Sequence, residues 1–277
     1  MIDAKPRLEQ SRAQSILWLL EELQIPYRLK TFKRGSDKLA PPELKTIHPL
    51  GKSPVVTIER AGQTKPLVLA ESGLIVEYLV EHFGGVEKGL VPARYEEGDS
   101  SGEETEAYMR YRFYMHYTEG SLMPPLVFSL VVNGKRSHPF YIPQATTSST
   151  DFLLHAGIRT APVPFFIKPV TRMIADKVNA SFLDRQLEGN FAFLEEQLKT
   201  APGVDRGVAT GGVCGKDMTA ADILMSFPII AATSRGAITK EKYPELVAYA
   251  GRLQAAEGYR KAVAKVEETE GKFVATL

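Results

Sequence analysis

The sequence predicts an α/β unit followed by an all-helical unit. Two stretches rich in β-branched residues, 54–58 and 67–69, lie near the start of the chain, beside segments with helical periodicity. Beyond residue 103, apolar residues recur every three to five positions and strand signals nearly vanish. The length of 277 residues suits about two domains. We therefore expect an α/β domain over residues 1–85, a linker over 86–103 and a helical domain over 104–277.

The composition excludes several classes of protein. Hydrophobic residues make up 44% of the chain, which excludes disorder of the whole. A single Cys cannot form an intramolecular disulfide, a Cys-x-x-Cys pair or a Cys-based zinc site, so we expect a metal-free, cytoplasmic protein. The net charge of +1 gives no bulk attraction to nucleic acid or to an anionic membrane. Since no stretch is apolar enough to span a membrane and no secretory signal is visible, we expect a small molecule or another protein as partner.

The first unit is expected to contain, in order, a helix over residues 11–24, a strand over 27–32, a helical turn at 41–43, strands over 54–58 and 67–69, and a helix over 71–83. The first helix carries its apolar residues on one face, and Ser11 with Gln14 matches an S-x-x-Q capping box at its start. The last two strands are expected to pair antiparallel, because the short stretch between them contains Gly62.

The second unit is expected to contain helices over residues 104–117, 168–199, 220–232, 243–256 and 258–268. Thr219 and Asp222 match a second capping box directly before an apolar run, which is typical of a structural helix start. The polar residues 133–151 predict a loop. The first of these helices carries Tyr108, Tyr111, Tyr114 and Tyr117. Their spacing is more often that of core residues than of a pocket lining, and both interpretations stay open.

Five segments of the chain form a characteristic set. They are SRAQSILWLLEEL at residues 11–23, LGKSPVV at 50–56, LAESGLI at 69–75, APVPFF at 161–166 and TAADI at 219–223. The set resembles the soluble glutathione transferases, in the bacterial and fungal branch that includes a yeast-type transferase. This resemblance implies a thioredoxin-like N-terminal domain that binds glutathione as co-substrate, a helical C-terminal domain that holds the acceptor, and a homodimer.

The first strand departs from the pattern of this family. Residues 2–8 show little apolar alternation, and Pro6 removes one donor from a strand ladder. We expect this strand to be shortened or irregular. If it is missing, the sheet loses support beside Ser11.

Glu71 and Ser72 lie where a strand gives way to a helix. Unpaired N–H groups and the positive end of the helix dipole suit a carboxylate there, with the Ser72 hydroxyl as a further donor and Glu71 as a partner for an ammonium. The resemblance implies that this pair holds the γ-glutamyl end of glutathione. The alternative is structural, with Ser72 capping the helix and Glu71 complementing its dipole.

The segment around Pro54 is expected to hold the middle of the same peptide. Pro54 begins a strand, where a missing N–H does little harm. The resemblance implies a cis bond between Ser53 and Pro54, and backbone pairing of Val55 with the cysteinyl part. It also places Lys52 near the glycyl carboxylate. A solvated loop lysine is the alternative.

Ser11 is the candidate catalytic residue. A thiol with a pKa of about 8.5 must become a thiolate to attack an electrophile at neutral pH. A hydroxyl hydrogen bond and a helix N-terminus together can lower the thiol pKa by about two units. Ser11 as a simple helix cap is the alternative, with Arg12 and the helix-end amides as other stabilisers of the anion.

The expected activity is a glutathione transferase that adds the activated thiol to a hydrophobic electrophile, with Tyr108 and Tyr111 as candidate lining of the acceptor site. Two alternatives stay open: a glutathione-dependent isomerase of a specialised metabolite, and a non-catalytic binding or scaffold protein. The sequence does not distinguish conjugation, isomerisation and peroxidase chemistry. Cys214 lies far from the first helix in sequence and is not assigned catalysis.

Overall fold

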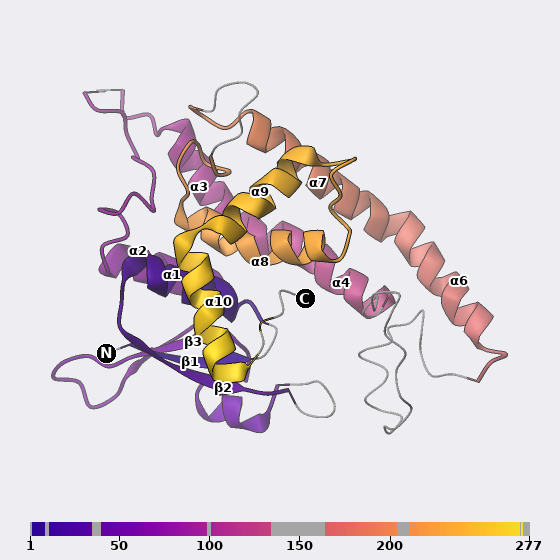
Figure 1. The fold of residues 1–277 in the computed structure, drawn as a ribbon, viewed down its shortest axis with the longest axis horizontal. Helices are drawn as coiled ribbons and strands as arrows, with labels where there is room; N and C mark the ends of the chain where they lie inside the picture. Colours follow the sequence, from indigo (N-terminus) through magenta and orange to yellow (C-terminus); the bar gives the residue numbers. More distant parts are fainter. Residues whose placement is uncertain are drawn as a thin grey trace.

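The structure is a computed structural model that describes residues 2–8, 11–34, 40–98, 101–133, 164–203, 211–271 and 273. A small sheet lies at one side of the molecule, and helices α1 and α2 lie between it and the larger group of helices (Figure 1). These two helices are α1 (Ala13–Leu23) and α2 (Ser72–His82). The α/β unit therefore comes first along the chain and the helical unit follows, as the sequence predicts.

The sheet has four strands in the order β2-β1-β3-β4. They are β1 (Ile2–Leu8), β2 (Tyr27–Phe32), β3 (Val55–Ile58) and β4 (Leu67–Ala70). The prediction of an antiparallel pair is confirmed, because β3 and β4 pair in that sense with Val55 opposite Ala70. A short 3-10 helix, η1 (Pro42–Thr46), carries Leu44, which packs with Leu8 and Phe32 in a small cluster separate from the main core.

The first strand is irregular but present. It pairs in parallel with β2, and the register shifts between Ala4 and Arg7, in the stretch that contains Pro6. A proline has no N–H to donate, which accounts for a local break in the ladder. Because β1 still lies between β2 and β3, the sheet keeps its support beside the start of α1.

The helical unit contains two long helical segments and a buried central helix. Its α-helices are α3 (Glu106–Tyr117), α4 (Met123–Asn133), α6 (Lys168–Val178), α7 (Asp184–Lys199), α8 (Ala220–Ser234), α9 (Pro244–Ala255) and α10 (Glu257–Glu270). Two π-helical turns, η2 (Thr118–Leu122) and η3 (Asn179–Leu183), join α3 to α4 and α6 to α7. The side-chain amides of Asn133 and Asn179 form two hydrogen bonds with each other, at 2.7 and 3.0 Å. These bonds connect the end of α4 to η3.

Helix α4 is absent from the sequence prediction. Pro124 and Pro125 fall in its first turn, directly after the π-helical turn. Prolines interrupt a regular helical pattern, but they are tolerated where the missing N–H groups have no ladder partner. Asn133, where the expected loop over 133–151 begins, is the last residue of α4, and the rest of that loop and residues 161–163 of the segment at 161–166 lie outside the described residues.

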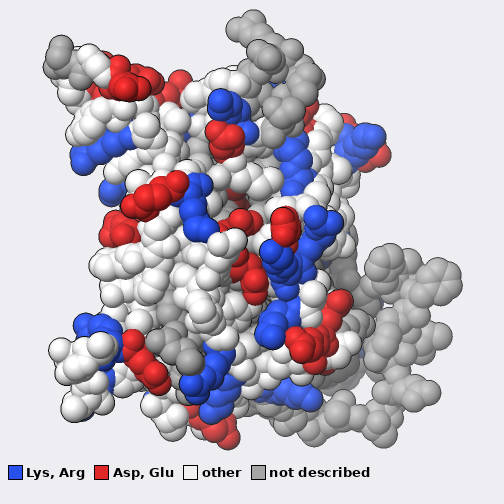
Figure 2. All heavy atoms as spheres, turned by 60° about the vertical axis from the view of Figure 1, so that its left-hand side comes forward, with Lys and Arg blue, Asp and Glu red and all other residues white. Residues whose placement is uncertain are grey.

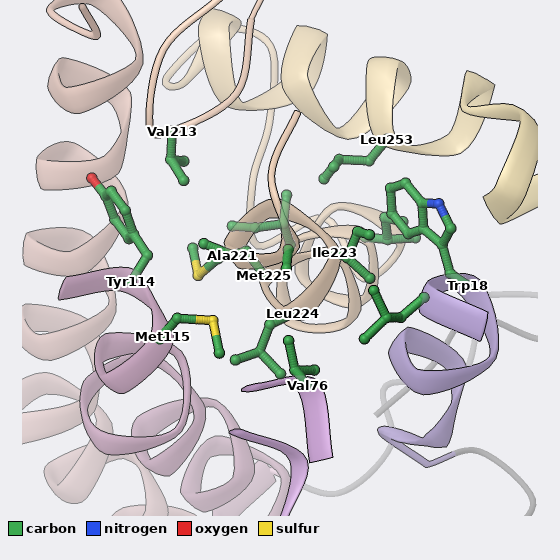
Figure 3. Close-up of a cluster of buried hydrophobic side chains, with 14 of the residues drawn as sticks. Trp18, Val76, Tyr114, Met115, Val213, Ala221, Ile223, Leu224, Met225 and Leu253 are labelled. Atoms are coloured by element: carbon green, nitrogen blue, oxygen red, sulfur yellow. The ribbon is translucent and has the colours of Figure 1, made fainter. Parts of the chain in front are cut away.

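One hydrophobic core joins the two units. Helix α8 is buried from Ala220 to Ala232 and packs against α1, α3 and α9. Figure 3 shows side chains of α8 between Trp18 of α1 on one side and Met115 of α3 on the other. The predicted capping box of Thr219 and Asp222 is confirmed at the start of this helix.

The contact between α10 and α1 depends on Gly258. A Cβ at this position would overlap Oε1 of Glu22 and lie 2.8 Å from Cδ1 of Trp18. The Trp18 indole N–H donates to the same carboxylate at 2.7 Å, which limits how far either side chain can withdraw. We expect Gly258→Ala to lower the free energy of unfolding by about 1–3 kcal/mol in urea titration. The matched change Gly251→Ala in α9 meets no atom within 4 Å and should raise it by about 0.5–1 kcal/mol. Equal effects of the two changes would contradict this packing.

Candidate functional site

Three segments that are distant in sequence meet at the start of α1. The Leu8 N–H at the end of β1 donates to Ser53 Oγ at 3.3 Å. The Ser11 and Ser53 hydroxyl oxygens lie 3.4 Å apart. The bond between Ser53 and Pro54 is cis, as the family resemblance implies. The end of β1, the start of α1 and the turn before β3 therefore form one local structure.

The capping box expected at Ser11 and Gln14 is wrong. Helix α1 begins at Ala13, and Arg12, its N-cap residue, makes no side-chain cap bond. Instead, Ser11 Oγ accepts the Ala13 N–H at 3.3 Å. The Gln14 side chain is buried, and neither its amide oxygen nor its nitrogen has a hydrogen-bond partner within the described part of the chain.

This geometry leaves the Ser11 proton available. A hydroxyl has one proton to donate and two lone pairs that accept. The Ala13 N–H uses one lone pair, so the proton can go to Ser53 or to a ligand atom in the site. Capping and donation to a ligand are therefore compatible, although the Ser11 side chain is only 8% exposed.

The turn before β3 presents backbone rather than side chains. Pro54 and Val55 are buried, and Val55 is the first residue of β3. Lys52, two residues before the cis bond, is exposed. This turn can therefore offer backbone groups to an extended peptide, together with the exposed ammonium of Lys52.

Glu71 and Ser72 form the junction of β4 with α2. Glu71 is exposed and is the N-cap residue with a φ of 73°, a conformation that non-glycine residues adopt rarely. Strained backbone of this kind is concentrated at functional sites. Ser72 is buried, and its hydroxyl donates to Oε1 of Glu119 at 2.7 Å. The sequence predicted the Ser72 hydroxyl as a donor to a ligand, whereas here it already has a carboxylate partner.

Glu119 is the site residue that the sequence prediction missed. It belongs to the π-helical turn η2 of the helical unit, and its Oε2 lies 3.3 Å from Nε of Arg12. No local pattern distinguishes this acidic residue, because its role depends on how η2 packs against the starts of α1 and α2. The site thus combines two helix N-termini with charges of both signs.

Tyr108 and Tyr111 are not among the residues that line the groove between α3 and α7. Tyr111 is buried in the core, and burial raises the pKa of its hydroxyl. Tyr108 is partly buried, with the Arg94 guanidinium 5.6 Å from the centre of its ring. These positions support the core interpretation for the pair.

An open groove lies on another face of α3. It has a volume of about 930 Å³ and runs between α3 and α7. Its lining includes aromatic rings and two exposed arginines: Phe113, Tyr117, Phe193, Arg112 and Arg185. Of the four tyrosines singled out in the sequence, Tyr117 alone reaches it.

Cys214 is placed for packing rather than chemistry. It is 1% exposed, and burial, with the nearby Asp222, raises the pKa of its thiol. A protonated, inaccessible thiol is a poor nucleophile. We expect no reaction of the folded protein with an aromatic disulfide reagent at neutral pH, and one thiol per chain after unfolding in guanidinium. Rapid labelling of the folded protein would contradict the burial.

The charged surface has no separation of sign on the face drawn in Figure 2. Lys and Arg alternate with Asp and Glu across the described atoms of that face. Among residues with a described position, no three His, Cys, Asp or Glu side chains are grouped as metal ligands. The described helices include none with both the length and the apolar character for crossing a membrane.

Known proteins resemble both parts of the chain. Residues 11–82 match the family model of the glutathione S-transferase N-terminal domain. Glutathione S-transferase 1 of Saccharomyces cerevisiae is 29% identical over 266 residues, which cover 96% of each protein. This relationship extends through the helical unit.

Solved structures share the fold. A glutathione S-transferase from Actinobacillus pleuropneumoniae is 23% identical, with a TM-score of 0.58 over 96% of this chain and 94% of that one. A glutathione transferase homologue from Lodderomyces elongisporus, solved with two glutathione molecules per subunit, is 15% identical, with a TM-score of 0.56 over 92% and 94%. The predicted fold class, a thioredoxin-like domain followed by a helical region, is confirmed.

Proposed function

We propose that the protein activates the thiol of glutathione and adds it to a hydrophobic electrophile, because residues 11–82 match the glutathione S-transferase N-terminal domain and nearly the whole chain is similar to a yeast glutathione S-transferase. The observation that carries this proposal is the meeting of Ser11 with Ser53 and the cis-proline turn at the start of α1. That arrangement brings a hydroxyl donor and a helix N-terminus beside a backbone segment suited to a peptide ligand.

In this proposal glutathione lies across three segments of the α/β unit. Its γ-glutamyl carboxylate binds the N–H groups at the start of α2, where Ser72 lies, and Glu71 receives its ammonium. The backbone of Val55 pairs with the cysteinyl part, and Lys52 meets the glycyl carboxylate. The bound glutathione in the Lodderomyces elongisporus homologue supports glutathione as the co-substrate.

Thiol activation follows from the chemistry at the start of α1. A hydrogen bond to a charged sulfur contributes about 1.5–3 kcal/mol, and a helix N-terminus contributes up to about 2 kcal/mol. Each pKa unit corresponds to about 1.36 kcal/mol, so a depression of the thiol pKa by about two units is attainable. Ser11 is the proposed donor, and Arg12 and the first amides of α1 are the alternative stabilisers of the anion.

A turnover assay tests the proposed reaction. Purified protein should consume glutathione in the presence of aryl halides, enals or organic peroxides, and mass spectrometry should identify a conjugate with the preferred electrophile. An isomerised product without a stable conjugate would favour the isomerase alternative. Glutathione binding by calorimetry without any turnover would favour the non-catalytic alternative.

We also propose a homodimer in the cytoplasm, with residues 1–85 and 104–277 as its two domains per chain. Large apolar side chains on α3 and α7 remain exposed, including Met109, Phe113 and Phe193. All three line the groove between these helices with Tyr117, which makes this face a suitable surface for a second copy. Light scattering should give twice the mass of one chain, and a monomer at micromolar concentration would contradict the dimer.

A further inference from the structure

The Ser53 hydroxyl lies between the end of β1 and the start of α1. Its oxygen accepts the Leu8 N–H at 3.3 Å and lies 3.4 Å from Ser11 Oγ. Ser53 is half-buried, and the next peptide bond along the chain is the cis bond to Pro54. This side chain therefore contacts the hydroxyl that is proposed to stabilise the thiolate.

The hydrogen-bond capacity of Ser11 limits where its proton can go. A hydroxyl has one proton and two lone pairs, and the Ala13 N–H fills one lone pair of Ser11 Oγ at 3.3 Å. If Ser53 donates to the second lone pair, Ser11 accepts two hydrogen bonds and its proton is directed to another group. If Ser11 donates to Ser53 instead, that proton is lost to the ligand.

A thiolate in the site favours the first of these directions. A charged acceptor attracts an O–H donor more strongly than a neutral hydroxyl does, so the sulfur takes the Ser11 proton in preference to Ser53. The Leu8 N–H, which donates to Ser53 Oγ, polarises the Ser53 O–H bond and makes it a better donor. The donors then follow one direction, from Leu8 to Ser53, from Ser53 to Ser11 and from Ser11 to sulfur.

The distance between the two hydroxyls fits a contact that the ligand completes. It is 3.4 Å, whereas bonded hydroxyl oxygens most often lie about 2.7–2.8 Å apart. Hydrogen bonds at catalytic sites are often long without substrate and shorten in its complex. Because a charge on sulfur polarises Ser11, we expect the contact with Ser53 to shorten when glutathione binds.

We propose that Ser53 is a positioning residue that donates its proton to Ser11 Oγ and thereby directs the Ser11 proton to the sulfur of bound glutathione. This inference rests on the proposed function, because it takes glutathione as the ligand and Ser11 as the donor to its thiolate. Two other roles lead to different results in experiment. Ser53 could compete with sulfur as an acceptor of the Ser11 proton, or it could be a structural tie between β1 and the turn before β3.

The thiol pKa of glutathione bound to Ser53→Ala separates a donor from a competing acceptor by the sign of its change. Polarisation by a donor supplies about 10–30% of the Ser11 hydrogen bond, and the lost direction of the proton adds to this, so the thiol pKa should rise by about 0.3–0.6 units. Ultraviolet titration of the thiolate measures the change. Loss of a competing acceptor would instead lower the thiol pKa.

The same substitution in a Ser11→Ala background tests whether Ser53 acts through Ser11. A positioning residue has nothing to position once the Ser11 hydroxyl is removed, so the double variant should match Ser11→Ala in thiol pKa within about 0.1 unit. S-methylglutathione, whose sulfur cannot form a thiolate, should bind Ser53→Ala with an affinity within about twofold of the natural chain by calorimetry. A structural tie would change both quantities.

Two further variants make the test independent of how well Ser53→Ala folds. Ser53→Thr keeps the hydroxyl, whereas Ser53→Val has nearly the same shape without it, and both residues suit the extended backbone that precedes a proline. Ser53→Thr should keep the thiol pKa within about 0.1 unit of the natural chain, and Ser53→Val should raise it as Ser53→Ala does. Ser181→Ala, on the exposed side of η3, is the control and should leave the thiol pKa unchanged.

Three outcomes overturn the inference. A lower or unchanged thiol pKa in both Ser53→Ala and Ser53→Val excludes donation to Ser11 and leaves the proposed function intact. A rise of equal size with and without the Ser11 hydroxyl identifies a structural tie and also leaves the proposed function intact. Failure of the natural chain to bind glutathione, or a bound thiol that titrates at the free value, overturns the proposed function together with this inference.

Discussion

Replacement of Asp222 by Ala is expected to lower the free energy of unfolding by about 4 kcal/mol. The side chain is fully buried and accepts four hydrogen bonds at 2.7–2.8 Å. The donors are the backbone N–H groups of Val213 and Thr219 and the hydroxyls of Thr219 and Tyr249. Ala leaves these donors without an acceptor in the core, and breaking a buried charged network typically costs about 3–5 kcal/mol.

Urea-induced unfolding followed by circular dichroism measures this loss. Asp222→Asn keeps the volume but turns a donor toward the surrounding donors, so we expect an intermediate loss of about 2–3 kcal/mol. Asp217→Ala is the control, because Asp217 is exposed three residues before Ala220, the first residue of α8. A loss below about 1 kcal/mol for Asp222→Ala would show that the network contributes little to stability.

Replacement of Ser11 by Ala is expected to lower kcat/KM at neutral pH by about 10- to 100-fold. The change removes a hydrogen bond to the thiolate that contributes about 1.5–3 kcal/mol, so the pKa of bound glutathione thiol should rise by about one to two units. The difference from the natural chain should shrink as the pH rises past the thiol pKa of the variant, because both proteins then hold thiolate.

The pH profile of kcat/KM checks this expectation, and calorimetry with glutathione checks that binding survives. Ser181→Ala is a suitable control, because Ser181 is exposed on η3 and its hydroxyl donates to the carbonyl of Lys177 at the end of α6. An unchanged rate for Ser11→Ala at neutral pH would assign thiolate stabilisation to Arg12 or to the first amides of α1 instead.

The strands and most of the helices could be predicted because their signals are local. The β-branched residues of β3 and the apolar residues of α1 are each close together in sequence and buried, so each signal comes from a single element. Helix α4 could not be predicted in this way, because Pro124 and Pro125 conceal its start and the π-helical turn before it has no simple signature.

The site was predictable only in part, because its decisive contacts are long-range. The capping box at Ser11 failed because Ser53, 42 residues away, lies against the same hydroxyl. The Ser72 hydroxyl, 47 residues from Glu119, likewise bonds to a carboxylate that the sequence did not single out. Local patterns identified the residues of the α/β unit, and long-range packing decided their partners, which come from the α/β unit for Ser11 and from the helical unit for Ser72.

The thiol pKa of bound glutathione tests the central claim most directly. The ultraviolet absorbance of the thiolate, titrated against pH in the presence of the natural chain, should give a pKa about two units below the value of about 8.5 for a free thiol. The same titration with Ser11→Ala should recover one to two of those units. A bound thiol that titrates at the free value, or a chain that does not bind glutathione at all, would contradict the account.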